Sequence, residues 1–308
     1  MKIVFMGTPK FAVPSLNILL DNHYEIPFVV TVPDKEKGRG LKKQFSDIKI
    51  FALEKNIPVL QPESLKYDDN FKIALKAANP DLIVIIAFSI LPRDVYTLPK
   101  FGSINLHASY LPKYRGAAPI NRAIMNGEKE TGLTTFFLKD KEDTGNIILR
   151  VRVPIYDEDN AGTLHNRLSI RGAELLLESI RLIESGDYSP LEQDDSIATK
   201  APKIFKNDCL IDWSNPALSI HNQIRGLSPY PAAYTYLNSK ICKIFTSKIT
   251  DFNSETEPGI IKIENKRFFV STGTNMLEIF DIQMEGKKRI SIADFLNGIN
   301  KNSLLKFN

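Results

Sequence analysis

A predicted strand near the middle of the chain places an amide and an imidazole two residues apart. The segment Gly102–Leu106 reads as a buried strand, and Asn105 and His107 lie at positions i and i+2 of its end. Successive side chains of a strand alternate, so both groups point to the same side. An amide and an imidazole side by side can stabilise an oxyanion that develops during acyl transfer. A lone histidine is more often structural, but the Pro- and Gly-rich loop that follows favours a site.

A polar loop supplies the second set of reactive groups. Residues 139–145 lie between two predicted strands and contain Asp140, Glu142 and Asp143. A carboxylate near His107 would favour the protonated imidazole and fix its orientation. It could also help to remove a proton from an attacking amine. The residue types leave open which carboxylate acts, and a solvated turn is the plain alternative.

The elements that must position these groups alternate between strands and helices. Apolar runs occur at residues 2–6, 26–32, 57–60, 82–87 and 102–106, with helical patterns at 11–20, 47–55 and 65–78. Such alternation, with strands that are apolar throughout, predicts a parallel sheet covered on both faces. Ligands bind at the carboxyl ends of these strands. We therefore predict a Rossmann-like open parallel α/β catalytic domain over residues 1–186.

The first turn argues against nicotinamide binding. Gly7, Thr8 and Pro9 stand where a dinucleotide-binding fold carries GxGxxG, but positions 9 and 12 are Pro9 and Ala12. The glycines of that fingerprint let the backbone approach a pyrophosphate closely. A dehydrogenase is therefore disfavoured, and we expect no NAD.

The last third of the chain has a different pattern of predicted secondary structure. Ala161–Ser185 predicts a long helix that Gly186 ends, and the polar residues 187–203 predict a linker. Helical patterns follow at 216–226 and 291–297, with five short extended runs at 232–237, 241–249, 259–263, 267–271 and 276–283. Short strands in succession predict a small β-barrel, OB-like, over residues 204–308.

Composition and charge narrow the class further. The two cysteines, Cys209 and Cys242, form no CxxC pair, so neither a zinc site nor a disulfide framework is expected. The apolar runs are too short for a signal peptide or a membrane span, which predicts a cytoplasmic protein. Residues 1–202 hold 26 basic and 26 acidic side chains, whereas 203–308 hold 14 and 10. A basic excess in one domain suits a polyanionic partner, although chance surface charge explains it equally well.

A basic segment near the N-terminus adds to this charge pattern. Residues 33–43 carry two glycines and five basic side chains: Lys35, Lys37, Arg39, Lys42 and Lys43. Clustered Lys and Arg on a glycine-containing loop suit contacts with phosphates. A solvated surface loop is the alternative.

Several motifs in this order resemble the folate-dependent formyltransferase family along nearly the whole chain. They are Gly7-Thr-Pro, Pro33-Asp34, Gly38-Arg-Gly40, Gln61-Pro62, Asn105-Leu-His-Ala-Ser-Tyr-Leu-Pro112, Tyr114-Arg-Gly-Ala-Ala-Pro-Ile120, Asp143-Thr-Gly145 and Ile211-Asp-Trp-Ser214. The resemblance implies a catalytic trio of Asn105, His107 and Asp143. It implies 10-formyltetrahydrofolate as formyl donor, with neither metal nor NAD.

The resemblance also implies binding residues and partners. Folate would contact two segments, namely Ser109, Tyr110, Leu111 and Pro112, and Phe88, Ser89, Ile90 and Leu91. The acceptor would be the α-amino group of methionine on initiator tRNA, contacted by Lys37, Lys42, Lys43 and an inserted Arg39. We expect a monomer that uses folate and tRNA and needs no membrane.

Two departures and two rival functions bear on this interpretation. Residues 139–142 are more polar than the family's pattern, and Asn146 stands where an acidic residue is common. The choice of Asp143 over its neighbours therefore depends on the resemblance. A formyltransferase for a sugar amine or another small amine is the nearest alternative. A tRNA- or RNA-binding protein without activity is the other, disfavoured by the trio.

Overall fold

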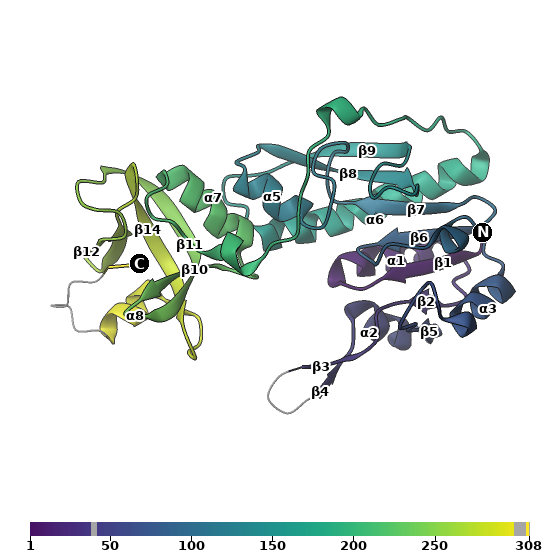
Figure 1. The fold of residues 1–308 in the computed structure, drawn as a ribbon, viewed down its shortest axis with the longest axis horizontal. Helices are drawn as coiled ribbons and strands as arrows, with labels where there is room; N and C mark the ends of the chain where they lie inside the picture. The colour runs from purple at the N-terminus through teal and green to yellow at the C-terminus, as the bar shows by residue number, and fades with distance from the viewer. Residues whose placement is uncertain (38–41, 299–305, 308) are drawn as a thin grey trace. The chain divides into compact units, whose positions relative to one another are not determined.

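The chain forms two compact units in a computed structural model that describes residues 1–37, 42–298 and 306–307 (Figure 1). The N-terminal unit contains residues 1–116, 131–153 and 165–200, and the C-terminal unit contains residues 117–130, 154–164 and 201–308. The predicted division is sequential, at 186 and 204. Both units instead include segments that are distant in sequence, because packing rather than chain order groups them.

The N-terminal unit is built on a seven-stranded sheet in the order β5-β2-β1-β6-β7-β8-β9. Its strands are β1 (Ile3–Gly7), β2 (Val29–Val30), β5 (Val59–Leu60), β6 (Leu82–Ile86), β7 (Ser103–His107), β8 (Glu130–Phe137) and β9 (Ile147–Pro154). Its helical segments are Lys10–Ala12, α1 (Val13–Asp21), α2 (Asp47–Glu54), α3 (Asp69–Ala78), α4 (Arg93–Tyr96), α6 (Ala161–Ser185) and Asp195–Ile197. The strands from β5 to β7 are parallel, and β8 pairs antiparallel with β7. The predicted Rossmann-like α/β sheet is confirmed, with this antiparallel addition.

The sheet's centre is apolar on both faces. All five residues of β1 and all five of β6 are buried, as their unbroken apolar sequences predict. On one face, Val4 and Met6 share a cluster with Phe71 and Leu75 of α3. Asp68 caps that helix by accepting a hydrogen bond from the Phe71 N–H at 2.9 Å. Truncating Phe71 to Ala would destabilise the unit by about 3–5 kcal/mol.

Helix α6 covers the strands that carry the reactive groups, and its bounds match the prediction. Gly172 permits a close approach, since a Cβ there would lie 2.8 Å from a methyl of Leu106 on β7. Further along, the hydroxyls of Thr135 on β8 and Ser179 on α6 lie 2.6 Å apart in the interior. The two contacts fix β7 and β8 against one helix.

The C-terminal unit combines two packed helices with an antiparallel sheet. Helix α5 (Pro119–Met125) lies against α7 (Ala217–Leu227), where Asn121 donates a hydrogen bond to the Gly226 carbonyl at 2.8 Å. The sheet runs β10-β11-β14-β13-β12, with β15 added on β14. Its elements are β10 (Ala233–Leu237), β11 (Lys240–Asn253), β12 (Ile261–Glu264), β13 (Arg267–Val270), β14 (Asn275–Met284), β15 (Ile290–Ser291) and α8 (Ile292–Asn297), preceded by a 3-10 turn at Lys206–Cys209.

Residues close to the C-terminus join the two edges of this sheet. Phe307 bridges Leu237 on β10, and Lys306 bridges Ile260, which precedes β12. The Phe307 ring is buried and stacks on Trp213, with centroids 5.3 Å apart. The Trp213 Nε1–H donates to the Thr235 hydroxyl at 3.0 Å. The predicted antiparallel domain is thereby confirmed, and this short segment closes it much as a partly open barrel of the OB type is closed.

The segment predicted as a linker is bound to the N-terminal unit over most of its length. Leu191 bridges Ile147, and Lys200 bridges Arg115. A polar sequence without periodicity has no signature for such pairing, because its partners lie far away in the chain. Among the residues that the structure describes, no helix is long and apolar enough to cross a membrane.

Candidate active site

The strand order reverses between β1 and β6, and the reactive residues lie on the β6 side of that point. The chain leaves β6 through Ala87, which has a φ of +47°, and residues 88–91 then form one wall of a small cavity of about 70 Å³. Residues 138–143, between β8 and β9, form the opposite wall. Crevices at the carboxyl ends of strands are the usual ligand sites of such sheets.

Asn105 lies on the floor of this cavity. It belongs to β7, lines the cavity and pairs with Phe136 of β8 across the sheet. Within the described parts of the chain, its side chain makes no hydrogen bond, so its amide N–H groups are available to a ligand. A donor held on a strand and facing a cavity is suited to an oxyanion.

His107 lies behind the cavity and is almost fully buried. Its Nε2 is 2.9 Å from the Tyr114 carbonyl oxygen. A carbonyl only accepts, so Nε2 carries a proton, and Nδ1 is the nitrogen that can gain or lose one. Nδ1 lies 3.7 Å from the Asp143 Oδ2, a distance at which charge is felt without a direct hydrogen bond. Within the described residues, His107 does not line the small cavity.

The three candidate carboxylates have different surroundings. Asp143 is buried, lines the cavity and faces His107. Asp140 accepts hydrogen bonds from Tyr96 and Arg93, and the bond that the Tyr96 hydroxyl donates to Asp140 raises the pKa of that hydroxyl. Glu142 is exposed to solvent. Only Asp143 is therefore placed to act together with the imidazole.

Several groups from elsewhere in the chain hold Asp143. The Gly116 N–H donates to its Oδ2 at 2.8 Å. Its backbone has a φ of +54°, and its carbonyl accepts from the side-chain amide of Gln193 at 2.9 Å. Gln193 was missed by the sequence analysis, because a glutamine in a polar segment carries no sign that it is buried.

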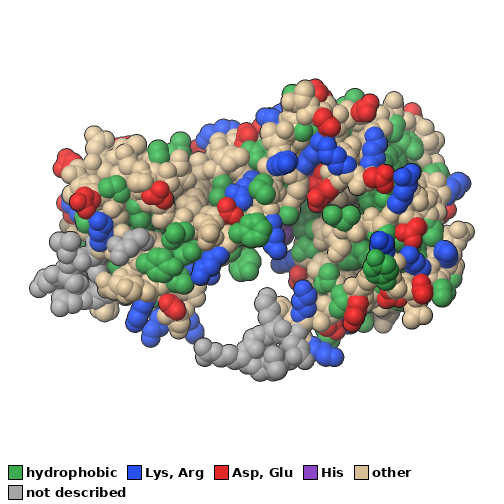
Figure 2. Space-filling view, viewed as in Figure 1, with side chains coloured by type: hydrophobic (Ala, Val, Ile, Leu, Met, Phe, Trp, Pro, Cys, Tyr) green, Lys and Arg blue, Asp and Glu red, His purple; other side chains and the backbone are tan. Residues whose placement is uncertain are grey.

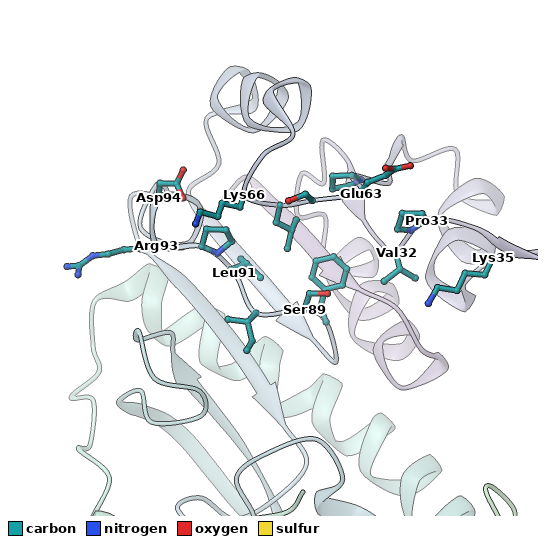
Figure 3. Close-up of a pocket in the computed structure, with 15 residues that line it drawn as sticks. Val32, Pro33, Lys35, Glu63, Lys66, Ser89, Leu91, Arg93 and Asp94 are labelled. Atoms are coloured by element: carbon teal, nitrogen blue, oxygen red, sulfur yellow. The ribbon is translucent and has the colours of Figure 1, made fainter. Parts of the chain in front are cut away.

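The Phe88–Leu91 wall also borders a second, larger cavity. This cleft of about 700 Å³ is lined on its other side by Val32, Pro33, Lys35 and residues 62–66 (Figure 3). Arg93 extends away from it in Figure 3, toward its ion pair with Asp140, whose closest atoms are 3.3 Å apart. Ile90 is 74% exposed although it is a large apolar residue. The Phe88–Leu91 segment thus presents apolar side chains to two neighbouring cavities.

The predicted folate segment Ser109–Pro112 lies beside the site, but its side chains point elsewhere. The Ser109 hydroxyl donates to the Lys113 carbonyl at 2.6 Å, and Leu111 is fully buried against Phe136. The Tyr110 ring has the guanidinium groups of Arg150 and Arg152 at 4.3 Å each. Among the described residues that line the small cavity, none comes from Ser109–Pro112. The segment shapes the turn that follows His107.

The basic segment forms a hairpin of β3 (Lys35–Lys37) and β4 (Lys42–Gln44). Arg39 lies outside the described residues, and so do the side chains of Lys37 and Lys42, whereas Lys43 is exposed.

A polar cluster holds the base of this hairpin. The Lys49 ammonium donates to Asp34 and to Gln61 at 2.6 Å each, and Gln61 donates to the other Asp34 oxygen at 2.8 Å. The hydrogen bond from Lys49 is the main reason that the pKa of Asp34 is lowered. The direction in which the hairpin leaves the sheet is therefore set by three side chains.

The C-terminal unit carries basic side chains at its surface. Exposed lysines of this unit include Lys203, Lys206, Lys240, Lys248 and Lys262. Figure 2 shows Lys and Arg side chains interspersed with acidic ones over the face of this unit that is drawn. Arg267 is bound by Glu278 at 2.6 Å, so its charge is already matched.

Known structures share this fold. A sugar 3N-formyl transferase, WlaRD, solved with dTDP and 5-N-formyl-THF, superposes with a TM-score of 0.67 at 23% identity over 94% of this chain and 99% of that one. HypX from Aquifex aeolicus in complex with tetrahydrofolic acid also gives a TM-score of 0.67, at 16% identity, over 100% of this chain and 51% of that one. At these identities, the likeness is one of fold.

Sequence comparison identifies the family. The family described as "Formyl transferase" matches residues 1–180, and "Formyl transferase, C-terminal domain" matches residues 203–300. The methionyl-tRNA formyltransferase of Caldanaerobacter subterraneus subsp. tengcongensis is 46% identical over 301 residues, covering 97% of each chain. That of Clostridium novyi is 46% identical over 310 residues, covering 99% of this chain and 100% of the relative. The chain therefore belongs to the methionyl-tRNA formyltransferase family of formyl transferases.

Proposed function

We propose that the protein transfers the formyl group of 10-formyltetrahydrofolate to the α-amino group of methionine on initiator tRNA. The observation that carries the proposal is full-length identity of 46% to methionyl-tRNA formyltransferases, joined to a cavity where Asn105 and Asp143 meet. Such an enzyme acts where translation begins, so we propose a cytoplasmic location and a monomer. The N-terminal unit would carry the chemistry, and residues 204–308 would bind tRNA.

The small cavity is suited to the flat ring system of a folate. One wall comes from Phe88, Ser89, Ile90 and Leu91, and the other from the Lys139–Asp143 loop. Apolar side chains would pack on the ring faces, and backbone groups of both loops would bind its polar edge. Ser109, Tyr110, Leu111 and Pro112 would contribute through the shape of their turn, which fixes the chain beyond His107.

The chemistry follows from the groups around the cavity. The methionyl amine attacks the formyl carbon, and the carbonyl oxygen becomes an oxyanion that accepts a hydrogen bond from the Asn105 amide. A proton on His107 Nδ1 places positive charge beside that oxyanion. The amine nitrogen must lose one proton and folate N10 must gain one as its bond to carbon breaks. Asp143 lines the cavity and lies 3.7 Å from Nδ1, so it can move that proton and help to orient the imidazole.

Phosphate contacts would hold the second substrate. The hairpin with Lys37, Arg39, Lys42 and Lys43 would contact the acceptor stem, with Arg39 as the inserted side chain. The exposed lysines of the C-terminal unit would add contacts with the phosphate backbone. The positive charge of the hairpin and of the C-terminal lysines supports these two sets of contacts. Each set predicts that the affinity for tRNA falls steeply as the salt concentration rises.

The test mixes the purified protein with 10-formyltetrahydrofolate and methionine-charged initiator tRNA and follows formylmethionyl-tRNA. We expect rapid transfer by the native protein and a loss of about 100-fold or more for His107→Ala, because it removes a charged group beside the oxyanion. If the protein consumed the folate with a small sugar amine but not with tRNA, folate would remain the formyl donor and methionyl-tRNA would be rejected as the acceptor. Binding of tRNA without transfer would reject the enzyme.

A further inference from the structure

We infer that Gln193 is a positioning residue for the reaction: its side-chain amide, oriented by Arg115, fixes the backbone of the Lys139–Gly145 loop and thereby the Asp143 carboxylate. This inference rests on the function proposed above, since it takes Asp143 as a catalytic group. Gln193 itself touches neither cavity, and it acts only through the loop.

Gln193 makes two hydrogen bonds to the loop with one nitrogen. Its Nε2 donates to the Asp143 carbonyl at 2.9 Å and to the Gly145 carbonyl at 2.8 Å, and both bonds are buried. The two carbonyls bracket Thr144, so a single side chain fixes the turn on which Asp143 is mounted. A buried carbonyl that lost its donor would be left without a hydrogen bond, which favours a change in the loop's conformation.

Arg115 determines which way the Gln193 amide points. The Arg115 Nε and Nη2 donate to the Gln193 Oε1 at 3.1 and 2.8 Å. Turning the amide over would set its oxygen against two carbonyls and its NH₂ against a guanidinium, so only one orientation satisfies every group. The third nitrogen, Nη1, is 2.7 Å from an Asp195 oxygen, and this pair lowers the pKa of Asp195.

The loop needs this support because its own backbone is strained. Asp143 has a φ of +54°, a left-handed conformation that is unfavourable for a residue other than glycine. Such a conformation persists only where the surroundings impose it. The backbone at Gly145 packs closely against β8, since a Cβ there would lie 1.5 Å from the Phe137 carbonyl oxygen. Without the Gln193 donor, the Asp143 backbone can relax and move its carboxylate away from His107.

The chain contains a matched control for a purely structural role. Gln223 on α7 makes the same kind of double contact, donating from Nε2 to the Asp208 carbonyl at 2.9 Å and to the Leu210 carbonyl at 3.0 Å. It belongs to the C-terminal unit and bears no relation to the Asp143 loop. Gln223→Met therefore removes a pair of bonds of the same type, nearer to the solvent than those of Gln193, without changing the catalytic group.

The experiment compares Gln193→Met, Gln193→Glu and Gln223→Met with the native protein in the formyl-transfer assay. We expect Gln193→Met to lower kcat by about 10- to 100-fold, the range for a catalytic group displaced by about 1 Å, with both KM values within about twofold. Gln193→Glu should lose as much, because it keeps an acceptor for Arg115 but offers no donor to the loop. Gln223→Met should keep kcat within about twofold.

Three outcomes would overturn the inference. The first is native kcat in Gln193→Met. The second is native kcat in Gln193→Glu, which would make the Arg115 contact the important one. The third is a raised KM for folate at unchanged kcat, which would make Gln193 a support for the folate pocket alone.

Amide hydrogen exchange of the free protein separates this inference from the proposed function. Gln193→Met should speed exchange in peptides from residues 139–146, and Gln223→Met should not. If the native protein transferred no formyl group but the loop still loosened, the proposed function would fail and the loop contact would stand. An active native protein with an unchanged loop and unchanged kcat would reject the inference alone.

Discussion

The Lys139–Gly145 loop and the Lys35–Gln44 hairpin look alike in sequence, yet they are supported in different ways. Both are short, polar and charged. The first is fixed along its length, by Gly116 and Gln193 on Asp143 and by Lys139 on Asn146. Among the described residues, the second is supported at its base, where Lys49 joins Asp34 to Gln61. The difference matches the work proposed for each, because proton transfer needs a side chain held within a fraction of an ångström, whereas phosphate contacts tolerate adjustment.

The largest effect is expected from Asp143→Asn. The amide keeps the shape and can still accept from the Gly116 N–H, but it neither takes a proton nor supports a charged imidazole. We expect kcat to fall by about 10²- to 10⁴-fold, with the KM for tRNA within about twofold. Steady-state kinetics with charged tRNA measures both. Asp140→Asn is the control, and an equal loss there would remove the distinction between the carboxylates.

A smaller effect of a different kind is expected from Arg39→Ala. This side chain lies outside the described residues, and the prediction comes from the basic sequence and the family resemblance. We expect the loss to fall on tRNA, with kcat/KM for tRNA lowered by about tenfold, while folate affinity stays unchanged. Tenfold corresponds to about 1.4 kcal/mol of binding free energy. If the kinetics on tRNA did not change, the hairpin would have no part in recognition.

Lys43→Ala should have a weaker effect that salt reveals. Lys43 is exposed on β4, and a single phosphate contact contributes about one unit to the slope of log affinity against log salt. We expect tRNA affinity to fall a few-fold at low salt and the slope to become shallower by about one. A titration of binding at four salt concentrations measures it. Lys100→Ala, at another surface lysine, should leave the slope as it is.

The smallest effect on catalysis is expected from His221, which belongs to the C-terminal unit, whereas both loops belong to the N-terminal unit. His221 in the C-terminal unit donates to or accepts from the Ser247 hydroxyl at 3.0 Å, and burial lowers its pKa from 6.5 to about 4. In the unfolded chain, His221 therefore binds a proton below about pH 6.5. In the folded chain, it binds that proton only below about pH 4. Its contribution to stability is complete above pH 6.5 and is lost as the pH falls through that window.

Replacing this residue should remove that dependence without touching catalysis. Between pH 7 and pH 5, the native protein should lose about 2 kcal/mol more unfolding free energy than His221→Asn. Urea denaturation followed by Trp213 fluorescence measures it, because the single tryptophan lies in the same unit. Equal losses in both proteins would show that His221 is not the group that titrates. At pH 7.5, kcat should be unchanged.

The elements of the site could be predicted from the sequence, but their supports could not. Strand β6 is apolar throughout, α6 has unbroken helical periodicity, and Asn105 and His107 follow the period of a strand, so local patterns are sufficient. Gln193 and Phe307 have no such pattern. Their burial depends on partners such as Asp143 and Trp213, which are distant in the chain.

The sequence also does not predict the direction in which a side chain points. The motif around Tyr110 predicts a folate contact but not that the guanidinium groups of Arg150 and Arg152 on β9 each lie 4.3 Å from its ring. These arginines sit two residues apart on one strand, and the pairing of that strand is set by tertiary structure. Choosing Asp143 among its neighbours likewise required knowing that Tyr96 and Arg93 bind Asp140.

The closure of the C-terminal sheet by Phe307 also has a consequence for how the protein is made. Synthesis runs from the N-terminus, so Trp213 and the edges at Leu237 and Ile260 are complete before Lys306 and Phe307 have been added. Until then, a tryptophan face and two strand edges lie uncovered, and bare edges pair readily with other chains. A chain that lacked Lys306 and Phe307 would therefore expose both strand edges, so these two residues protect the sheet against pairing with neighbouring chains.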